Sequence, residues 1–187
     1  MDKSHYPPFA SLAYLKAGTP RQQEAYQAIA GSGVFRLLAA YTPVLAGTIP
    51  IDIDIETSDL DIICEVHDAK RFAATLTAGL SSHQGFTMHE EIVQGLPVVI
   101  CRFTYMDFAF EVFGQPLPVS KQNAYLHMLA EYSLLQAAGP SGKEAIRALK
   151  RQGLKTEPAF ARYFGISGDP YEALLKLGKH IVHEGGI

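Results

Sequence analysis

The 187-residue sequence has few cysteines, no long apolar run and no excess of basic residues. Cys64 and Cys101 are its only cysteines, and both lie in strand-like runs, which favours reduced core thiols over a disulfide or a metal site. No run approaches the roughly 18 apolar residues of a membrane span, and residues 1–8 contain no apolar signal core. We therefore expect a cytoplasmic protein without a membrane-spanning segment.

The balance of charges limits the partners that the protein can have. Sixteen Lys and Arg residues against 19 Asp and Glu residues give a formal net charge of −3. Proteins that coat DNA without sequence preference depend on many cationic contacts to phosphates, so we expect no non-specific DNA binding. A small nucleotide or a local basic patch remains compatible with this charge. The hydrophobic content of 48% is sufficient for one well-packed core.

Residues 46–63 combine a glycine turn with two acidic residues in a strand-like run. Asp59 and Asp61 are two positions apart among apolar neighbours, so their side chains should leave a strand on the same face. Such a pair of carboxylates repels itself unless a cation or a proton neutralises it, and Mg²⁺ binds carboxylate and phosphate oxygens together. Upstream, Gly47 lets the backbone approach a phosphate and Thr48 adds a hydroxyl. The pattern predicts a metal and phosphate site.

The order of periodic segments predicts an α+β fold, in which a mixed sheet of four or five strands is flanked by helices and followed by a C-terminal helical bundle. We expect an N-terminal segment at 1–18, an α/β core at 19–118, and a helical region at 119–187 packed on that core. Residues 49–57 alternate and contain a proline, which predicts an extended loop or an edge strand. Ser120 is a plausible cap for the first helix of the C-terminal region, which Gly139 and Pro140 should interrupt.

The glycine turn followed about a dozen residues later by Asp-x-Asp resembles the signature of the polymerase-β-type nucleotidyltransferase superfamily. Within it, Gly-Thr-Ile-Pro-Ile at 47–51 and Ser-Asp-Leu-Asp at 58–61 resemble the family called domain of unknown function 4269. Three later segments fit the same family: Phe-Glu-Val-Phe-Gly-Gln at 110–115, Gln-x-x-Tyr-x-His-Met at 122–128, and Lys-Thr-Glu-Pro-Ala-Phe at 155–160. The resemblance extends from about Leu12 to Leu177.

The resemblance implies a nucleotidyltransferase-like fold that binds Mg²⁺ or Mn²⁺ and a nucleoside triphosphate. It implies that Asp59 and Asp61 hold the metal and that Glu111, a charge in the middle of an apolar strand, supplies the third carboxylate. A buried salt bridge is the alternative interpretation of Glu111, and Asp107 is a competitor for the third position, although it occupies an expected hairpin turn. Ser58 and His127 match the family motifs as further nucleotide-binding candidates, together with the Gly47–Thr48 turn. An exposed, functionless histidine is an equally good interpretation of His127.

Two sets of charges flank the expected site without an assigned role. Asp52, Asp54 and Glu56 alternate along the segment between the turn and the aspartates, where they add negative charge near a phosphate site. They are interpreted as a solvent face, or as extra sites for a metal or a cationic substrate. A basic helix face in the C-terminal region could hold a triphosphate or RNA, or could simply be solvated; its members are Lys143, Arg147, Lys150, Arg151 and Lys155.

These observations predict a metal-dependent nucleotidyltransferase that transfers a nucleoside monophosphate from a nucleoside triphosphate to an acceptor hydroxyl. The acceptor can be a small molecule, a protein or RNA. Two alternatives stay open. One is a non-catalytic binding module that kept the fold, for example half of a toxin–antitoxin pair, and the other is a metal-dependent phosphohydrolase that uses the same acids with water as acceptor.

Overall fold

The computed structural model describes residues 8–185, which form two compact units. We call residues 8–50 with 59–119 the sheet unit, and residues 51–58 with 120–185 the helical unit. Residues 51–58 thus group with the C-terminal helices, and neither unit is a continuous stretch of chain. The expected division at residues 18 and 118 stays a prediction, and residues 1–7 of its first segment lie outside the described residues.

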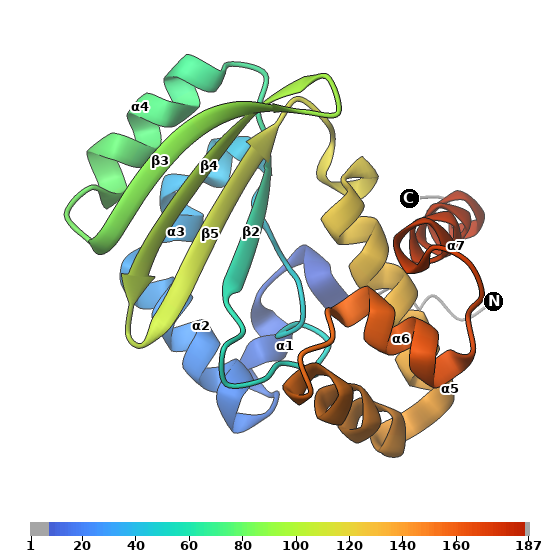
Figure 1. The fold of residues 1–187 in the computed structure, drawn as a ribbon. Helices are drawn as coiled ribbons and strands as arrows, with labels where there is room; N and C mark the ends of the chain where they lie inside the picture. The colour runs from blue at the N-terminus through green and yellow to red at the C-terminus, as the bar shows by residue number, and fades with distance from the viewer. Residues whose placement is uncertain (1–7, 186–187) are drawn as a thin grey trace. The chain divides into compact units, whose positions relative to one another are not determined.

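A five-stranded mixed sheet forms the centre of the sheet unit, which confirms the expected fold class (Figure 1). Its strands follow the order β1-β2-β5-β4-β3, in which β2 and β5 are parallel and all other neighbours are antiparallel. Their bounds are β1 (Val44–Ala46), β2 (Leu60–Glu65), β3 (Gln84–Val93), β4 (Leu96–Tyr105) and β5 (Phe108–Gln115).

Helices of the sheet unit cover one face of this sheet (Figure 1). They are α1 (Ala13–Lys16), α2 (Pro20–Ser32), α3 (Val34–Leu37) and α4 (Ala69–Leu80), with short 3-10 turns at Pro8–Ala10 and Ala39–Tyr41. Local sequence accounts for two of the helix starts. The side chain of Thr19 caps α2 in front of Pro20, and the carboxylate of Asp68 accepts a hydrogen bond from the backbone N–H of Arg71 at the start of α4.

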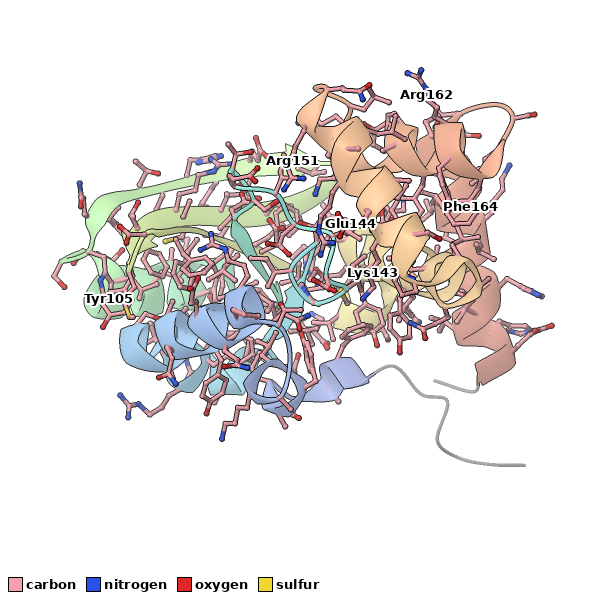
Figure 2. All side chains as sticks on the ribbon, turned by 90° about the horizontal axis from the view of Figure 1, so that it is seen from below. Tyr105, Lys143, Glu144, Arg151, Arg162 and Phe164 are labelled. Atoms are coloured by element: carbon pink, nitrogen blue, oxygen red, sulfur yellow. The ribbon has the colours of Figure 1, made fainter. Side chains whose placement is uncertain are left out.

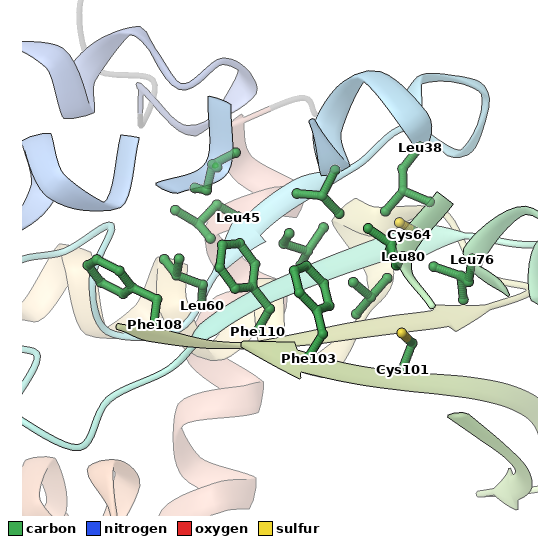
Figure 3. Packing of buried hydrophobic residues seen from close by; sticks show 14 of the residues in the cluster. Leu38, Leu45, Leu60, Cys64, Leu76, Leu80, Cys101, Phe103, Phe108 and Phe110 are labelled. Atoms are coloured by element: carbon green, nitrogen blue, oxygen red, sulfur yellow. The ribbon is translucent and has the colours of Figure 1, made fainter. Parts of the chain in front are cut away.

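The core of the sheet unit lies between the helices and one face of the sheet (Figure 3). Phe103 and Phe110, from neighbouring strands, point toward the helices and stack with their ring centroids 4.6 Å apart. Cys64 and Cys101 point into the same core as two unlinked thiols, and burial raises their pKa to about 12 and about 11. Because strand residues alternate, the charged neighbours of these core residues leave the sheet on its other face.

The helical unit contains α5 (Asn123–Arg151), α6 (Thr156–Phe164) and α7 (Pro170–Gly185), which pack against one another. The expected interruption of the first helix is confirmed, because Gly139 has the non-helical angles φ 67° and ψ −163°. The expected cap at Ser120 is wrong: residues 119–121 form a 3-10 turn, and Gln122 takes the capping position of α5. Among residues 8–185, no helix has both the length and the apolar character that membrane crossing requires.

Residues 51–58 form a loop in the helical unit. The edge-strand alternative for 49–57 is therefore wrong, since these residues form turns and irregular backbone. Asp52 has a positive φ of 58°, which places it in the left-handed region that interrupts an extended strand.

Candidate functional site

The turn after β1 brings Gly47 against Asp61 of β2. Ala46 and Asp61 are paired residues of the antiparallel β1–β2 ladder, and Gly47 follows with a positive φ of 79°. A Cβ atom on Gly47 would lie only 2.2 Å from Oδ2 of Asp61. The carboxylate therefore packs directly over bare glycine backbone, so both the backbone angle and the free space require glycine at this position.

Gln22 of α2 binds the backbone of the same turn through hydrogen bonds, a role that the sequence did not predict. Gln22 is 7% exposed, and its side-chain amide donates hydrogen bonds to the carbonyls of Ile49 at 2.9 Å and Pro50 at 3.2 Å. Its amide oxygen accepts a hydrogen bond from the backbone N–H of Thr19 at 3.1 Å. The available signal was a glutamine three positions after a capping threonine, which is a capping box. Gln22 thereby links the helix start to the backbone that follows Gly47.

A row of three charged residues crosses the sheet on the face away from the core. Asp61 of β2 is the register partner of Glu111 of β5, which in turn is the register partner of Arg102 of β4. The residues before and after Asp61 and Glu111 point into the core. The structure therefore places Glu111 beside Asp61 on a shared face, as the alternation of the two strands predicted.

Glu111 forms an ion pair with Arg102. Nε of Arg102 donates a hydrogen bond to Oε2 of Glu111 at 2.8 Å, and Nη2 contacts the same oxygen. The pair is partly open to solvent, with 27% of the Glu111 side chain and 50% of the Arg102 side chain exposed. The salt bridge that was the alternative interpretation of Glu111 is therefore present, but it is partly exposed and not buried. The competitor Asp107 lies exposed in the β4–β5 turn with a φ of 61°, as expected for a turn residue.

The oxygen donors of this face match a hard divalent cation only in part. Asp59 directly precedes β2 and is half-buried, and Asp61 follows two residues later beside the Gly47 turn. Carboxylates of this kind are the donors that Mg²⁺ and Mn²⁺ take. Across residues 8–185, however, no three His, Cys, Asp or Glu side chains form a group that could hold a metal ion. The two aspartates are of the donor type that the expected cation takes, whereas Glu111 is bound to Arg102.

In the helical unit, the acidic loop binds the basic face of α5. Nζ of Lys143 donates to Oδ2 of Asp52 at 3.0 Å, and Arg147 donates to both the carboxylate and the carbonyl oxygen of Asp52. Arg151 binds Glu56 at 2.8 Å. Figure 2 labels Lys143 and Arg151 along this part of α5. The basic face therefore neutralises the loop acids, which gives a structural role to charges that the sequence left unexplained.

Lys150 extends this contact into the interior. Its side chain is buried, and Nζ donates a hydrogen bond to the carbonyl of Ile53 at 2.9 Å. The interpretation of the basic face as a solvated surface is therefore wrong for Lys143, Arg147 and Lys150, which are all at least half-buried and bound to the loop.

The two remaining candidates, Ser58 and His127, have contacts within the helical unit. The hydroxyl of Ser58 accepts a hydrogen bond from the backbone N–H of Ile55 at 3.0 Å. Nε2 of His127 lies 3.1 Å from the carbonyl of Tyr171, and Nδ1 lies 3.2 Å from the carboxylate of Glu157. The interpretation of His127 as an exposed histidine is wrong, because only 14% of its side chain is exposed.

Glu131 is a buried acid near the His127–Glu157 pair, and the sequence did not single it out. It lies on α5 within an apolar stripe and is 4% exposed. Burial raises the pKa of Glu131 well above its ordinary value, the nearby Glu157 raises it further, and Lys150 lowers it in part. Burial acts to raise the pKa of Glu157, but the hydrogen bond from His127, a backbone hydrogen bond and the charges of His127 and Lys155 together hold that pKa below its ordinary value.

Replacing Glu131 by glutamine is expected to raise thermal stability at pH 8 and to leave it nearly unchanged at pH 4. A carboxyl whose pKa is higher in the folded state contributes stability below its unfolded pKa, and that contribution is lost as the pH rises. Melting temperatures measured every half pH unit from 4 to 8 test this, with the exposed Glu172→Gln as control. If Glu131→Gln melts lower than the wild type at pH 8, Glu131 is instead a stabilising ionised partner of Lys150.

Solved structures of RNA-modifying transferases share the fold of this chain. A poly(U) polymerase, Cid1, bound to MgGTP matches with a TM-score of 0.51 and 14% identity, over 68% of this chain and 41% of its own. A cytoplasmic RNA terminal U-transferase matches with a TM-score of 0.50 and 16% identity, over 71% of this chain and 41% of its own. The chain spans less than half the length of these proteins. The fold is therefore that of a nucleotidyltransferase, as the superfamily resemblance predicted.

A third similar structure, the GLD-2/RNP-8 complex, has a TM-score of 0.50 and 10% identity, with 79% of this chain and 59% of the other covered. No curated protein sequence matches this chain significantly. A family model does match: the model for the domain of unknown function DUF4269 covers residues 27–177 of this chain. That range includes the turn, the aspartates, Glu111 and the helical segments that carried the sequence resemblance. The chain belongs to the DUF4269 family.

Proposed function

We propose that the protein is a metal-dependent nucleotidyltransferase that transfers a nucleoside monophosphate from a nucleoside triphosphate to an acceptor hydroxyl. The observation that carries this proposal is the packing of the Asp61 carboxylate over the bare backbone of Gly47, with Asp59 two residues upstream. In a nucleotidyltransferase fold, this combination supplies oxygen donors for a cation beside a turn that phosphate oxygens can approach closely. The fold of the solved structures and the family match support the assignment.

In the proposed reaction, the acceptor oxygen bonds to the α-phosphorus, the bond from that phosphorus to the β-bridging oxygen breaks, and pyrophosphate leaves. Asp59 and Asp61 would hold Mg²⁺ or Mn²⁺, which neutralises phosphate charge when it is bound. Gly47 and Thr48 steady the phosphates through the backbone and a hydroxyl. Glu111, once released from Arg102, completes the donor set or accepts the proton of the acceptor hydroxyl. Ser58 and His127 stay predictions as nucleotide contacts.

One observation favours the non-catalytic alternative. Glu111, the proposed third carboxylate, is bound to Arg102, and the described residues contain no group of three possible metal ligands. In a binding module without catalysis, Glu111 would stay bound to Arg102 whichever nucleotide is present. The two functions therefore differ in whether a nucleotidylated product forms.

A combined binding and product experiment tests the proposal. Millimolar Mg²⁺ or Mn²⁺ with the correct nucleoside triphosphate should raise the melting temperature, because a ligand at about 100 times its Kd stabilises the folded state by about 2.7 kcal/mol. The same nucleotide with EDTA, and each metal alone, are the controls. Mass analysis then separates a nucleotidylated acceptor with pyrophosphate from simple hydrolysis. Unchanged melting with all four nucleotides and both metals would count against the enzyme.

A further inference from the structure

We propose that His127 is a pH-sensitive clamp, in which a doubly protonated imidazole ring ties the first turns of α6 and α7 to α5. The inference goes beyond the proposed function, because all the contacts that it uses lie within the helical unit. It concerns how the three helices of that unit are held together. The hydrogen-bonding capacity of the atoms around one ring carries it.

The imidazole ring of His127 bridges three helices. His127 belongs to α5, Glu157 lies in the first turn of α6, and Tyr171 is the second residue of α7. Nδ1 of the ring lies 3.2 Å from the Glu157 carboxylate, and Nε2 lies 3.1 Å from the backbone carbonyl oxygen of Tyr171. The three helices pack against one another (Figure 1). One side chain of α5 therefore joins the starts of the two following helices.

The two partners of the ring are both hydrogen-bond acceptors. A backbone carbonyl oxygen has no proton to donate, and neither has an ionised carboxylate. A neutral imidazole has a single N–H, so it could donate to only one of these oxygens, and its second nitrogen would face an oxygen lone pair. An imidazolium donates from both nitrogens and satisfies both contacts. The geometry thus selects the doubly protonated ring of His127.

This argument requires an ionised Glu157, and the surroundings of that carboxylate favour ionisation. Its place in the first turn of α6 puts it near the positive end of the helix dipole. Burial acts to raise the pKa of Glu157, but the hydrogen bond from His127 helps to hold that pKa below its ordinary value. Only 14% of the His127 side chain and 19% of the Glu157 side chain are exposed, so water screens this pair less than a surface ion pair.

The charged and titratable groups around the clamp come from all three helices. They are Glu131 and Lys150 of α5, Lys155 and Glu157 at the start of α6, and Asp169 and the Tyr171 phenol at the start of α7. Burial raises the pKa of Glu131, so the stability that this carboxyl contributes is also lost as the pH rises. A test of the clamp therefore has to remove the titration of Glu131 first.

The clamp makes the docking of α6 and α7 depend on pH in a defined direction. Glu157, with a lowered pKa, contributes above its ordinary titration range, and its contribution is lost as the pH falls. His127 contributes in its protonated form, so one of its two links is lost when the ring gives up a proton as the pH rises. The clamp is thus complete in weakly acidic solution and is released in part on the alkaline side of neutrality.

Nitrogen-15 NMR of the imidazole ring tests the protonation state in the wild-type protein. At about pH 7, in the range where histidine changes its charge, His127 should show two protonated ring nitrogens. A ring with one N–H and one bare nitrogen at that pH overturns the inference.

Hydrogen exchange followed by mass spectrometry measures the release of the helices. In a protein that carries Glu131→Gln, protection factors at the starts of α6 and α7 should fall about tenfold between about pH 6 and pH 8.5, the factor for one hydrogen bond to a charged group. His127→Gln in the same background should have the lower protection at both pH values, because a glutamine amide does not titrate. His180→Gln, which changes an exposed histidine of α7, should keep the full pH dependence.

Glu157→Gln separates the clamp from a merely structural contact. The amide of the new side chain can donate to a bare Nδ1, so a neutral His127 keeps both links and the fall in protection should disappear. An equal fall in His127→Gln overturns the inference, and so does an undiminished fall in Glu157→Gln. If His127→Gln does not fold, the Glu157→Gln result and the ring NMR of the wild type still decide between the two outcomes.

Discussion

Replacing Asp61 by asparagine is expected to reduce nucleotide transfer by at least about a hundredfold, the loss typical of removing one group that stabilises charge in the transition state. The carboxylate that packs over Gly47 would lose its charge without losing its shape. Folding should persist, and the melting temperature should be equal or slightly higher, because repulsion between neighbouring carboxylates disappears. Asp59→Asn is expected to behave in the same way. Product formation and thermal melting, measured on the same samples, test both variants.

Asp107→Asn provides the matched control for these two variants. Asp107 lies in the β4–β5 turn with a positive φ, a conformation that asparagine tolerates as well as aspartate does. It should change neither transfer nor melting. If both single variants, Asp59→Asn and Asp61→Asn, unfold, the aspartates have a structural role. If both transfer nucleotide as well as the wild type does, they do not belong to the catalytic site.

Replacing Gly178 by alanine is expected to destabilise the helical unit by about 1–3 kcal/mol. Gly178 lies in α7 against α5, where an added Cβ would be 2.1 Å from the carbonyl oxygen of Leu126. Because this neighbour is backbone, a rotated side chain cannot relieve the contact, and the two helices must separate. The better helix propensity of alanine offsets only part of the loss. Urea unfolding followed by circular dichroism measures the change.

Gly31→Ala is the control for that substitution. Gly31 is also helical, but its added Cβ would meet the hydroxyl end of the Tyr105 side chain at 2.9 Å, and a side chain of this kind can move. We expect a change within about 0.5 kcal/mol, as for most surface substitutions. Equal stability of Gly178→Ala and the wild type would mean that α5 and α7 are not in close backbone contact.

Most of the fold, and the shared face of the candidate site residues, could be predicted from local sequence. Alternation in β2 and β5 was sufficient to place Asp61 and Glu111 on one face, because the apolar residues between them had to enter the core. The cap at Thr19 and the break at Gly139 followed from side-chain and backbone chemistry within a few residues. These features depend on short stretches of chain.

The features that sequence reasoning missed depend on pairing between distant residues. Arg102 reaches Glu111 only because β4 lies beside β5 in a particular register, and a shift by one residue would send it into the core. The partners of Asp52 on α5 are 91 and 95 residues away along the chain, so no local pattern connects them. A polar residue on an apolar helix face, such as Gln22, is visible in a sequence, but its backbone partners are not.

The contact between the acidic loop and α5 has a consequence for the order in which the protein can be completed during synthesis. Asp52 is translated 91 residues before Lys143 and 95 before Arg147, and the sheet unit is complete through residue 119 before either cationic partner is made. The loop joins its cationic partners only once the second half of α5 has been translated. A chain cut at residue 119 would therefore contain every strand of the sheet as well as Asp59 and Asp61. In that chain, Asp52 and Glu56 would lack the lysine and arginine side chains that bind them.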